Sequence, residues 1–418
     1  MKCTGLSASG ALFLLLFRRV NLKGGMYMKF SHKAALLAAA AAASAAALAG
    51  CGTAKPAGSS DLIIIGANLE MTGSNASFGT SSLNGIHMAV EDANVAGGVL
   101  GKKIQVIGVD NRSEVAGAAD ALAKLAESGV AAIIGPDTSS NVIALASQAA
   151  ADKIPIVSPS GTNPAITVDP ATGQTREYLF RACFTDPYQG RVMADFATGR
   201  LNAKKAVVLV DNSSDYSKGL AEFFTKEFQE KGGSVPAQEA YMARDVDFKP
   251  ILTKAAALHP DIIFVPGYYQ EVGLILRQAR EMGITVPILG GDGWDSDKLV
   301  EIAGTANLSN TYFCNHYSQE DDNPKLQDFI RRYEARYGAA PDSFAVTAYD
   351  AAGLVLEAIE AGRSDKPADV AKALTGIKGY DGISGKITID SHHNTVSSGI
   401  IMSFANGRRT FIERIDPE

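Results

Sequence analysis

The chain has 418 residues, of which 46% are hydrophobic and 20% are charged, a globular composition long enough for two hydrophobic cores. Residues 1–50 hold six basic and no acidic residues, so the basic count falls from 39 to 33 beyond them, against 45 acidic residues and a net charge of about −12. This charge argues against a nucleic-acid partner, because clustered Lys and Arg drive binding to phosphates.

The first 50 residues are typical of a leader that is removed after export. From Met28, a short basic stretch precedes the apolar run Ala34–Ala49, which ends at Gly50-Cys51. This ending is similar to a bacterial lipobox, in which the cysteine (here Cys51) receives a diacylglycerol group and becomes the new N-terminus. A plain secretory signal and a transmembrane anchor are the alternatives, although the run is short and rich in Ala for a membrane span. Residues 51–60 are then expected to form a flexible tether.

Residues 1–27 precede a signal that is already complete from Met28. We therefore hypothesise that they come from a mis-assigned start site.

Of the four cysteines, Cys3 lies in this segment and Cys51 at the lipobox, which leaves Cys183 and Cys314. A disulfide between these two and a pair of buried free thiols are both compatible with an exported protein.

From residue 61 onward, short Val- and Ile-rich runs bounded by Gly and Pro alternate with amphipathic stretches. This alternation predicts an α/β fold with parallel sheets covered by helices on both faces. In the first half, strands are expected at 62–65, 104–109, 131–134 and 155–157, with helices at 81–95, 114–128 and 140–152. In the second half, strands are expected at 206–210, 261–265, 286–289, 386–389, 398–404 and 410–415, with helices at 217–231, 248–258, 272–282, 325–337 and 344–361.

Two loops rich in small hydroxyl residues follow neighbouring predicted strands. They are Gly135–Asn141 and Ser158–Pro164. In parallel sheets, ligands bind beyond the carboxyl ends of the strands, where Ser and Thr side chains and helix N-termini can donate to a carboxylate. Any one of these residues could instead simply cap a helix, but two such loops together favour an anion site.

From residue 61 to 415 the sequence resembles the leucine/isoleucine/valine-binding protein family, the type I periplasmic binding proteins that serve amino-acid ABC importers. The resemblance rests on the two hydroxyl loops and on the order and spacing of further motifs: Leu69–Phe78, Asn94–Gly101, Phe184–Gly190 and Gly290–Asp295. It implies two doubly wound parallel-sheet lobes joined by three crossover strands.

The resemblance also implies a ligand site. Ser139, Ser160 and Thr162 would bind the ligand carboxylate. Asp292 would accept a hydrogen bond from the ligand ammonium group. From the second lobe, Tyr216 and Tyr268 would approach the ligand, while Phe78 and the small Gly161 would border a mainly apolar side-chain pocket. Without the resemblance, Asp292 reads as a residue of a Gly-rich turn. Trp294 would shape the pocket or cover its rim.

The implied crossovers match Arg181–Asp186, Phe313–Tyr317 and Tyr380–Gly385. Lobe one would then hold residues 61–183 and 314–383, and lobe two residues 187–312 and 384–415. Because Cys183 and Cys314 fall on two of these crossovers, the resemblance favours a disulfide between them.

The expected function is the capture of an amino acid by hinge closure of the two lobes, with Leu, Ile or Val as the first choice. The protein would be a lipid-anchored monomer that delivers the amino acid to the permease subunits of an ABC importer. A ligand sensor for another amino acid or a small amide, signalling to a membrane receptor, is the alternative. We expect no enzyme, cofactor or metal site, since neither a G-x-S-x-G elbow nor an S-x-x-K or H-E-x-x-H motif is present. The location would be the extracytoplasmic face of the membrane, in a periplasm or on the outer cell surface.

Overall fold

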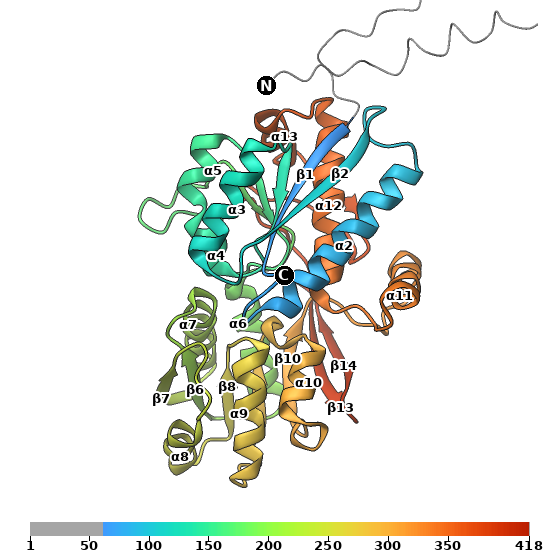
Figure 1. The fold of residues 1–418 in the computed structure, drawn as a ribbon. Coiled ribbons are helices and arrows are strands. Elements are labelled where there is room, and N and C mark those ends of the chain that lie inside the picture. The colour runs from blue at the N-terminus through green and yellow to red at the C-terminus, as the bar shows by residue number, and fades with distance from the viewer. Residues whose placement is uncertain (1–61, 418) are drawn as a thin grey trace, which may run out of the picture. The chain divides into compact units, whose positions relative to one another are not determined.

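The computed structural model describes residues 62–417. They form two α/β lobes, and each lobe is built around one large β-sheet (Figure 1). The sheet of lobe one has the strand order β2-β1-β3-β4-β5, and all its strands are parallel. Its strands are β1 (Leu62–Leu69), β2 (Lys103–Asp110), β3 (Ala132–Ile134), β4 (Ile156–Ser158) and β5 (Leu179–Arg181). Its helices are α2 (Ala76–Val95), α3 (Val115–Glu127), α4 (Ser139–Ala144), α5 (Ala146–Asp152), α11 (Pro324–Tyr337), α12 (Ser343–Gly362) and α13 (Pro367–Leu374).

Close helix packing in lobe one depends on a glycine. A Cβ atom on Gly85 of α2 would lie only 2.1 Å from the carbonyl oxygen of Ala345 in α12. Since no side chain fits there, Gly85 allows the two helices to touch along their backbones. This contact brings the N-terminal ends of α2 and α12 together beside the carboxyl ends of the lobe-one strands (Figure 1).

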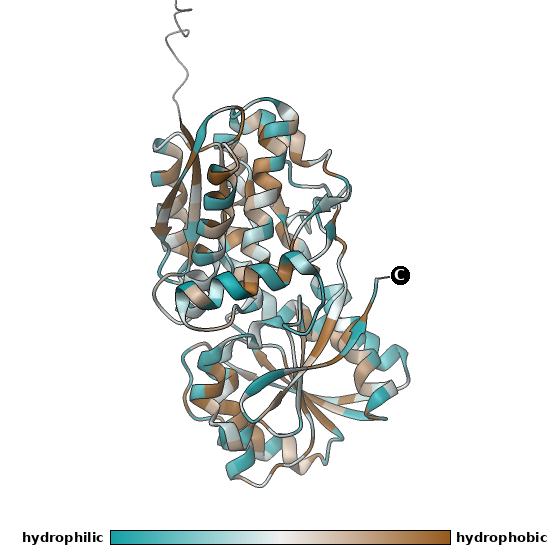
Figure 2. Ribbon diagram, turned by 90° about the vertical axis from the view of Figure 1, so that its right-hand side faces the viewer, coloured by the Kyte–Doolittle hydropathy of each residue, from teal (hydrophilic) through white to brown (hydrophobic). Residues whose placement is uncertain are grey.

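Lobe two has a seven-stranded sheet in the order β14-β13-β10-β9-β8-β6-β7. Figure 2 shows hydrophobic residues along its strands. These strands are β6 (Lys205–Asp211), β7 (Ser234–Tyr241), β8 (Ile262–Val265), β9 (Ile288–Gly290), β10 (Thr311–Asn315), β13 (Gly399–Ala405) and β14 (Arg408–Ile415). The helices are α6 (Asp186–Asp195), α7 (Asp215–Glu230), α8 (Lys249–Ala257), α9 (Tyr269–Glu281) and α10 (Asp297–Ala303).

The central strands of lobe two are hydrophobic on both faces, as a sheet covered on both sides requires. Along β6, Val207 and Leu209 face a core with α8, α9 and α10, whereas Val208 and Val210 face a second core with α6 and α7. The sheet is not purely parallel, however. β13 runs antiparallel to both β10 and β14.

The chain crosses between the lobes three times. The first crossing follows β5, and the second follows β10, beyond which Tyr317 packs in lobe one against α11 and α12. The third differs from the expected segment Tyr380–Gly385, which lies within a small hairpin of β11 (Tyr380–Asp381) and β12 (Lys386–Ile387).

This hairpin belongs to lobe one, because Ile387 and Ile389 are buried in the lobe-one core. The third crossing therefore lies between residues 390 and 398. There the Thr395 hydroxyl donates to the Cys183 carbonyl oxygen at 2.8 Å, beside the first crossing. The expectation that residues 384–389 lie in lobe two is thus corrected.

The expected disulfide is also corrected, because Cys183 and Cys314 are both free and buried. The Cys183 thiol donates to the Gly161 carbonyl oxygen at 3.3 Å, whereas Cys314 packs in the lobe-two core between the sheet and α6. The two thiols therefore have different neighbours and are not bonded to each other. Cys51 and the predicted leader and tether lie outside the described residues.

Candidate functional site

The first hydroxyl loop, Gly135–Asn141, is held in place by a buried carboxylate at the end of β1. Glu70 accepts hydrogen bonds from the backbone N–H groups of Asp137 (3.0 Å) and Thr138 (3.3 Å), from the Thr138 hydroxyl (2.8 Å) and from Asn141 Nδ2 (2.8 Å). Four donors satisfy the charge of this carboxylate inside the protein. They also fix the course of the loop from β3 into α4.

The second hydroxyl loop, Ser158–Pro164, is held by a buried arginine. Arg181 donates to the carbonyl oxygens of Gly161 and Asn163, both at 2.7 Å. The two loops are also joined directly, since the Ser158 hydroxyl donates to the Pro136 carbonyl oxygen (2.7 Å) and the Asn163 N–H donates to Ser139 Oγ (3.3 Å).

The three predicted carboxylate ligands therefore lie on two adjoining loops at the same edge of the lobe-one sheet. Ser139, Ser160 and Thr162 are all buried. The Ser160 hydroxyl is within hydrogen-bonding distance of the Asp137 carboxylate (3.0 Å), and Thr162 Oγ1 has no hydrogen bond of regular geometry in the part of the chain that the structure describes. Gly161 lies between them, and its N–H donates to Ser158 Oγ at 2.9 Å.

Asp292 begins the short 3-10 helix η3 (Asp292–Trp294), which follows β9 in lobe two. Its backbone N–H donates to Gln189 Oε1 (2.7 Å), and its Oδ2 lies 3.1 Å from His316 Nε2. The other carboxylate oxygen, Oδ1, is buried and has no hydrogen bond of regular geometry among residues 62–417, although the Tyr216 hydroxyl lies close to this carboxylate. Such an oxygen is well suited to accept a donor from a bound molecule.

The two predicted tyrosines lie beside Asp292. The rings of Tyr216 and Tyr268 are nearly parallel, with centroids 5.1 Å apart, and Tyr216 Oη accepts the Gly293 N–H at 3.3 Å. Burial, followed by the neighbouring charge of Asp292, raises the pKa of Tyr216 well above its usual value. Tyr216 is therefore a neutral hydroxyl group at the site.

Phe78 of lobe one contacts aromatic rings of both lobes on another side of the site. Its ring stacks on Phe344 of α12 at a centroid distance of 3.8 Å and meets Tyr268 (5.7 Å) and Tyr269 (5.0 Å) of lobe two edge to face. These four rings provide an apolar surface next to the polar groups.

Trp294 does not cover a pocket rim. Its side chain is fully buried in the lobe-two core, where Nε1 donates to the Val265 carbonyl oxygen (3.0 Å) and the indole packs against Phe313 and the backbone of Gly290. The indole thus supports β9, the strand that leads to Asp292.

The lobes are in contact across the site, which is the arrangement of a closed state. Asn163 Nδ2 of lobe one donates to the Asp215 carbonyl oxygen (2.8 Å), and the Asp215 N–H donates to Ser140 Oγ (3.0 Å). On the other side, Ser77 Oγ lies 2.8 Å from Ser296 Oγ. A cavity of ≈ 130 Å³ remains between the lobes, bordered by Thr138, Ser140 and Asn141 of lobe one and by Ser214, Tyr268 and Glu271 of lobe two. Of the predicted ligand residues, Tyr268 alone borders this cavity.

Several polar residues of the site were not assigned from the sequence: Arg181, Asp186, Gln189, Asn163 and His316. Asp186 and Gln189 belong to the motif Phe184–Gly190, which was recognised without roles for its residues. Burial raises the pKa of Asp186 to about 8, against a smaller lowering contribution from the Thr162 hydroxyl. His316 stands alone in its segment, so no spacing pattern pointed to it.

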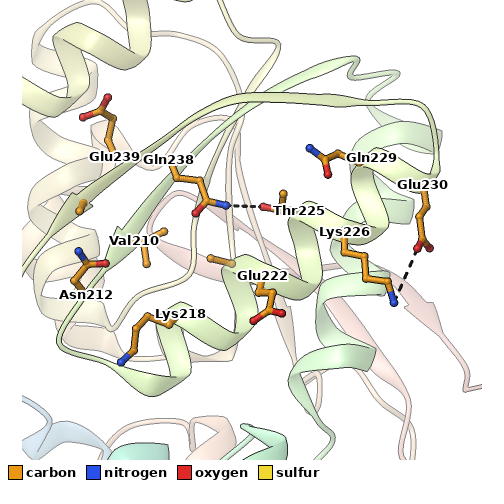
Figure 3. Close-up of a pocket in the computed structure, with 12 residues that line it drawn as sticks. Val210, Asn212, Lys218, Glu222, Thr225, Lys226, Gln229, Glu230, Gln238 and Glu239 are labelled. Carbon is orange, nitrogen blue, oxygen red and sulfur yellow. Dashed lines mark hydrogen bonds and ion pairs between the residues drawn. The ribbon is translucent and has the colours of Figure 1, made fainter.

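A larger groove lies away from the site, on the surface of lobe two between α7 and β7 (Figure 3). Its volume is ≈ 930 Å³, and its walls carry charges of both signs, including the ion pair between Lys226 and Glu230. These charged side chains are well exposed, so the groove has the character of a solvated surface.

Within residues 62–417, no cluster of three or more His, Cys, Asp or Glu side chains is placed to bind a metal ion. The same residues contain no helix with the length and hydrophobicity needed to cross a membrane.

Comparison with known proteins yields consistent matches. The sequence model of a family described as "Periplasmic binding protein" matches residues 63–408. The Leu/Ile/Val-binding protein homolog 3 of Brucella melitensis is 30% identical over 327 residues, which cover 78% of this chain and 86% of the relative. The solved structure of the leucine-binding protein LivK from Thermotoga maritima has a TM-score of 0.80 at 36% identity and covers 85% of this chain and 99% of that one. LivJ from Streptococcus pneumoniae, a branched-chain amino acid transporter substrate-binding protein solved with isoleucine, has a TM-score of 0.80 at 37% identity, with coverage of 85% and 100%.

Proposed function

Because the chain belongs to the periplasmic binding protein family, we propose that it is an extracytoplasmic solute-binding protein that captures a free α-amino acid between its lobes. The observation that carries this proposal is the pairing of a buried hydroxyl set on lobe one with a buried carboxylate oxygen of Asp292 that has no hydrogen bond of regular geometry among the described residues.

The chemistry of a zwitterion fits this arrangement. Its carboxylate needs hydrogen-bond donors, which the hydroxyls of Ser139, Ser160 and Thr162 can supply, and its ammonium group needs an acceptor, which Asp292 Oδ1 can supply. Burying either charge without a partner is costly, so a ligand that carries both groups is favoured over one that carries a single charge.

Ligand binding would stabilise the closed state. The donors belong to lobe one and Asp292 to lobe two, so only the closed arrangement satisfies both ends of the ligand. We propose that this closed form delivers the amino acid to the permease subunits of an ABC importer. Relatives named for leucine, isoleucine and valine, together with the aromatic surface around Phe78, make a branched-chain amino acid the starting candidate.

We further propose that the protein acts without catalysis, as a monomer, and is held at the membrane through a diacylglyceryl group on Cys51. Two acyl chains are sufficient for stable membrane attachment. Metabolic labelling with a radioactive fatty acid tests this anchor, because label should be incorporated into the wild-type protein and absent from the Cys51→Ala variant.

The amino-acid site is tested by a thermal-shift screen of residues 52–418, stripped of ligand, against the twenty amino acids and small amides, followed by calorimetry. A ligand at a thousandfold excess over Kd stabilises the folded state by about 4 kcal/mol, so a true ligand should be evident. If a folded, ligand-free protein responds to no α-amino acid, the proposed function is wrong.

A further inference from the structure

Asp137 is a buried acid that lies within the first hydroxyl loop and has one oxygen still available. Its Oδ1 accepts a hydrogen bond from the Ser82 hydroxyl (2.8 Å), and the Ser160 hydroxyl lies within reach of both this oxygen (3.0 Å) and the Asp137 carbonyl oxygen (3.1 Å). Its Oδ2 is buried and has no hydrogen-bond partner in the described part of the chain. The residue itself is only 3% exposed, so solvent does not satisfy this oxygen.

The neighbours of Asp137 place it on the side of the site where the apolar rings lie. Ser82 follows Phe78 by one helical turn on α2, so the two side chains share a face of that helix. Ser82 Oγ also lies 3.4 Å from the carbonyl oxygen of Phe344, whose ring stacks on Phe78. Asp137 is therefore linked directly to Ser160, which faces the ligand carboxylate in the proposed site, and through Ser82 to the backbone of Phe344.

The surroundings of Asp137 favour its neutral, protonated form. No Lys or Arg forms an ion pair with it among residues 62–417, whereas the buried carboxylates of Glu70 and Asp342 lie near it. Burial, and then the charge of Glu70, raise the pKa of Asp137 well above its usual value. Because the Ser82 hydroxyl already donates to Oδ1, the proton is best placed on Oδ2, which makes that atom a hydrogen-bond donor.

We propose that Asp137 determines ligand specificity by donating a hydrogen bond to a polar group on the ligand side chain, so that the site prefers a hydroxyl- or amide-bearing amino acid to an aliphatic one of the same shape. This inference rests on the proposed amino-acid site and replaces its branched-chain starting candidate with a polar amino acid. A purely aliphatic side chain would leave the buried carboxyl group unpaired, and sites that are built to hydrogen-bond a substrate discriminate strongly against analogues lacking the polar group.

Two isosteric ligand pairs test the inference: threonine against valine, and asparagine against leucine. Calorimetry on the stripped wild-type protein should give a Kd at least tenfold lower for the polar member of at least one pair. In Asp137→Leu that preference should be lost or reversed, whereas Asp137→Asn retains a side-chain donor and should keep it. Thermal unfolding of each variant without ligand verifies that it is folded.

Asp350→Asn is the matched control. Asp350 is also a buried carboxyl group of lobe one that accepts a serine hydroxyl, but its partners are Ser384 and the backbone N–H of Ile383 rather than groups of the Ser160 loop. Its substitution should leave the ratio of the two Kd values unchanged. Tighter binding of valine and leucine by the wild-type protein, or equal effects of Asp137→Leu on both members of each pair, would overturn the inference and leave the proposed function intact. Failure of every amino acid to bind would instead overturn the proposed function.

Discussion

His316 Nε2 and Asp292 Oδ2 lie 3.1 Å apart in a buried contact between the second crossing segment and the end of β9. The imidazole ring also stacks on Phe184 at 3.8 Å, so its position is fixed from two directions. With Oδ2 bonded to His316, the remaining oxygen of Asp292 is the one available to a ligand. His316 is thus a positioning residue for the carboxylate that we assign to the ammonium group.

The first prediction concerns this carboxylate. Asp292→Asn keeps the size of the side chain but removes its charge, so the ligand ammonium would lose a buried ionic partner. We expect the ligand Kd to rise by a factor of about 100, since buried charge-assisted pairs contribute several kcal/mol. Calorimetry with the best ligand measures the change.

Glu301→Gln provides the control for Asp292→Asn. It neutralises an exposed carboxylate on α10 of the same lobe, which forms an ion pair with Lys298. The Kd of the ligand for Glu301→Gln should equal its Kd for the wild-type protein. An unchanged Kd in Asp292→Asn would remove this residue from the ammonium site.

The second prediction concerns lobe closure. In Ser140→Ala, the N–H of Asp215 at the start of α7 loses its acceptor on the opposite lobe. One hydrogen bond contributes about 1 kcal/mol, so the affinity should fall by a factor of about 5, mainly through faster ligand release. Stopped-flow measurement of the release rate checks this.

Ser128→Ala serves as the comparison, because its exposed hydroxyl donates to the Lys124 carbonyl oxygen at the end of α3, within lobe one. Equal release rates for the two variants would show that the contact between Ser140 and Asp215 does not favour the closed state.

Much of the fold could be predicted from sequence because both sheets consist of Val- and Ile-rich strands with clear boundaries. β7 was missed for a physical reason. It is the edge strand of lobe two, its residues are partly exposed on alternating sides, and its sequence SVPAQEAY lacks an apolar run. α6 was missed because its first residues belong to Phe184–Gly190, which served only as a motif of the resemblance and received no secondary structure, although Pro187 at the first turn is compatible with a helix start.

The site was predicted in part. The resemblance pointed to residues on strand-end loops, where side chains of one edge converge, and the structure brings Ser139, Ser160 and Thr162 onto adjoining loops. The groups that fix these loops could not be found in this way. Glu70 and Arg181 act through contacts between segments far apart in the chain, and a single sequence contains no signal for such pairs.

The third prediction is a pH dependence that arises from Asp186. Its pKa is raised to about 8 by burial, whereas in the unfolded chain it titrates near 4. The folded protein therefore binds one more proton than the unfolded chain between about pH 4 and 8, and this group's contribution to stability falls as the pH rises through that range. Asp186→Asn removes the titration. The free energy of unfolding of the variant minus that of the wild type should therefore increase between pH 5 and pH 8.

Urea denaturation at pH 5, 6.5 and 8 measures this difference. Asp215→Asn is the matched control, because Asp215 also lies in the first turn of a helix, but its side chain is 42% exposed and pairs with Lys218. A constant difference between Asp186→Asn and the wild type across the pH range would contradict the assignment.

The fourth prediction concerns the cysteines. Residues 52–418 contain only Cys183 and Cys314, and both are free in the structure. Thiol titration after denaturation without reductant should therefore give two thiols per chain, and a reductant should leave the melting temperature unchanged. A count of zero together with a lower melting temperature in reductant would indicate a disulfide instead.

The last prediction concerns Arg181, which holds the second hydroxyl loop from inside the protein. Arg181→Met keeps much of the side-chain volume but leaves the carbonyl oxygens of Gly161 and Asn163 without their donors. We expect the free energy of unfolding to fall by about 3 kcal/mol, because unpaired buried polar groups are costly. Ligand affinity should fall as well, since Gly161 and Thr162 belong to the same loop. Arg112→Met is the control, as Arg112 is 53% exposed and lies 3.7 Å from its acidic partner Asp120. If Arg181→Met is destabilised but binds ligand with wild-type affinity, then the loop keeps its shape without the arginine, and Arg181 serves stability alone.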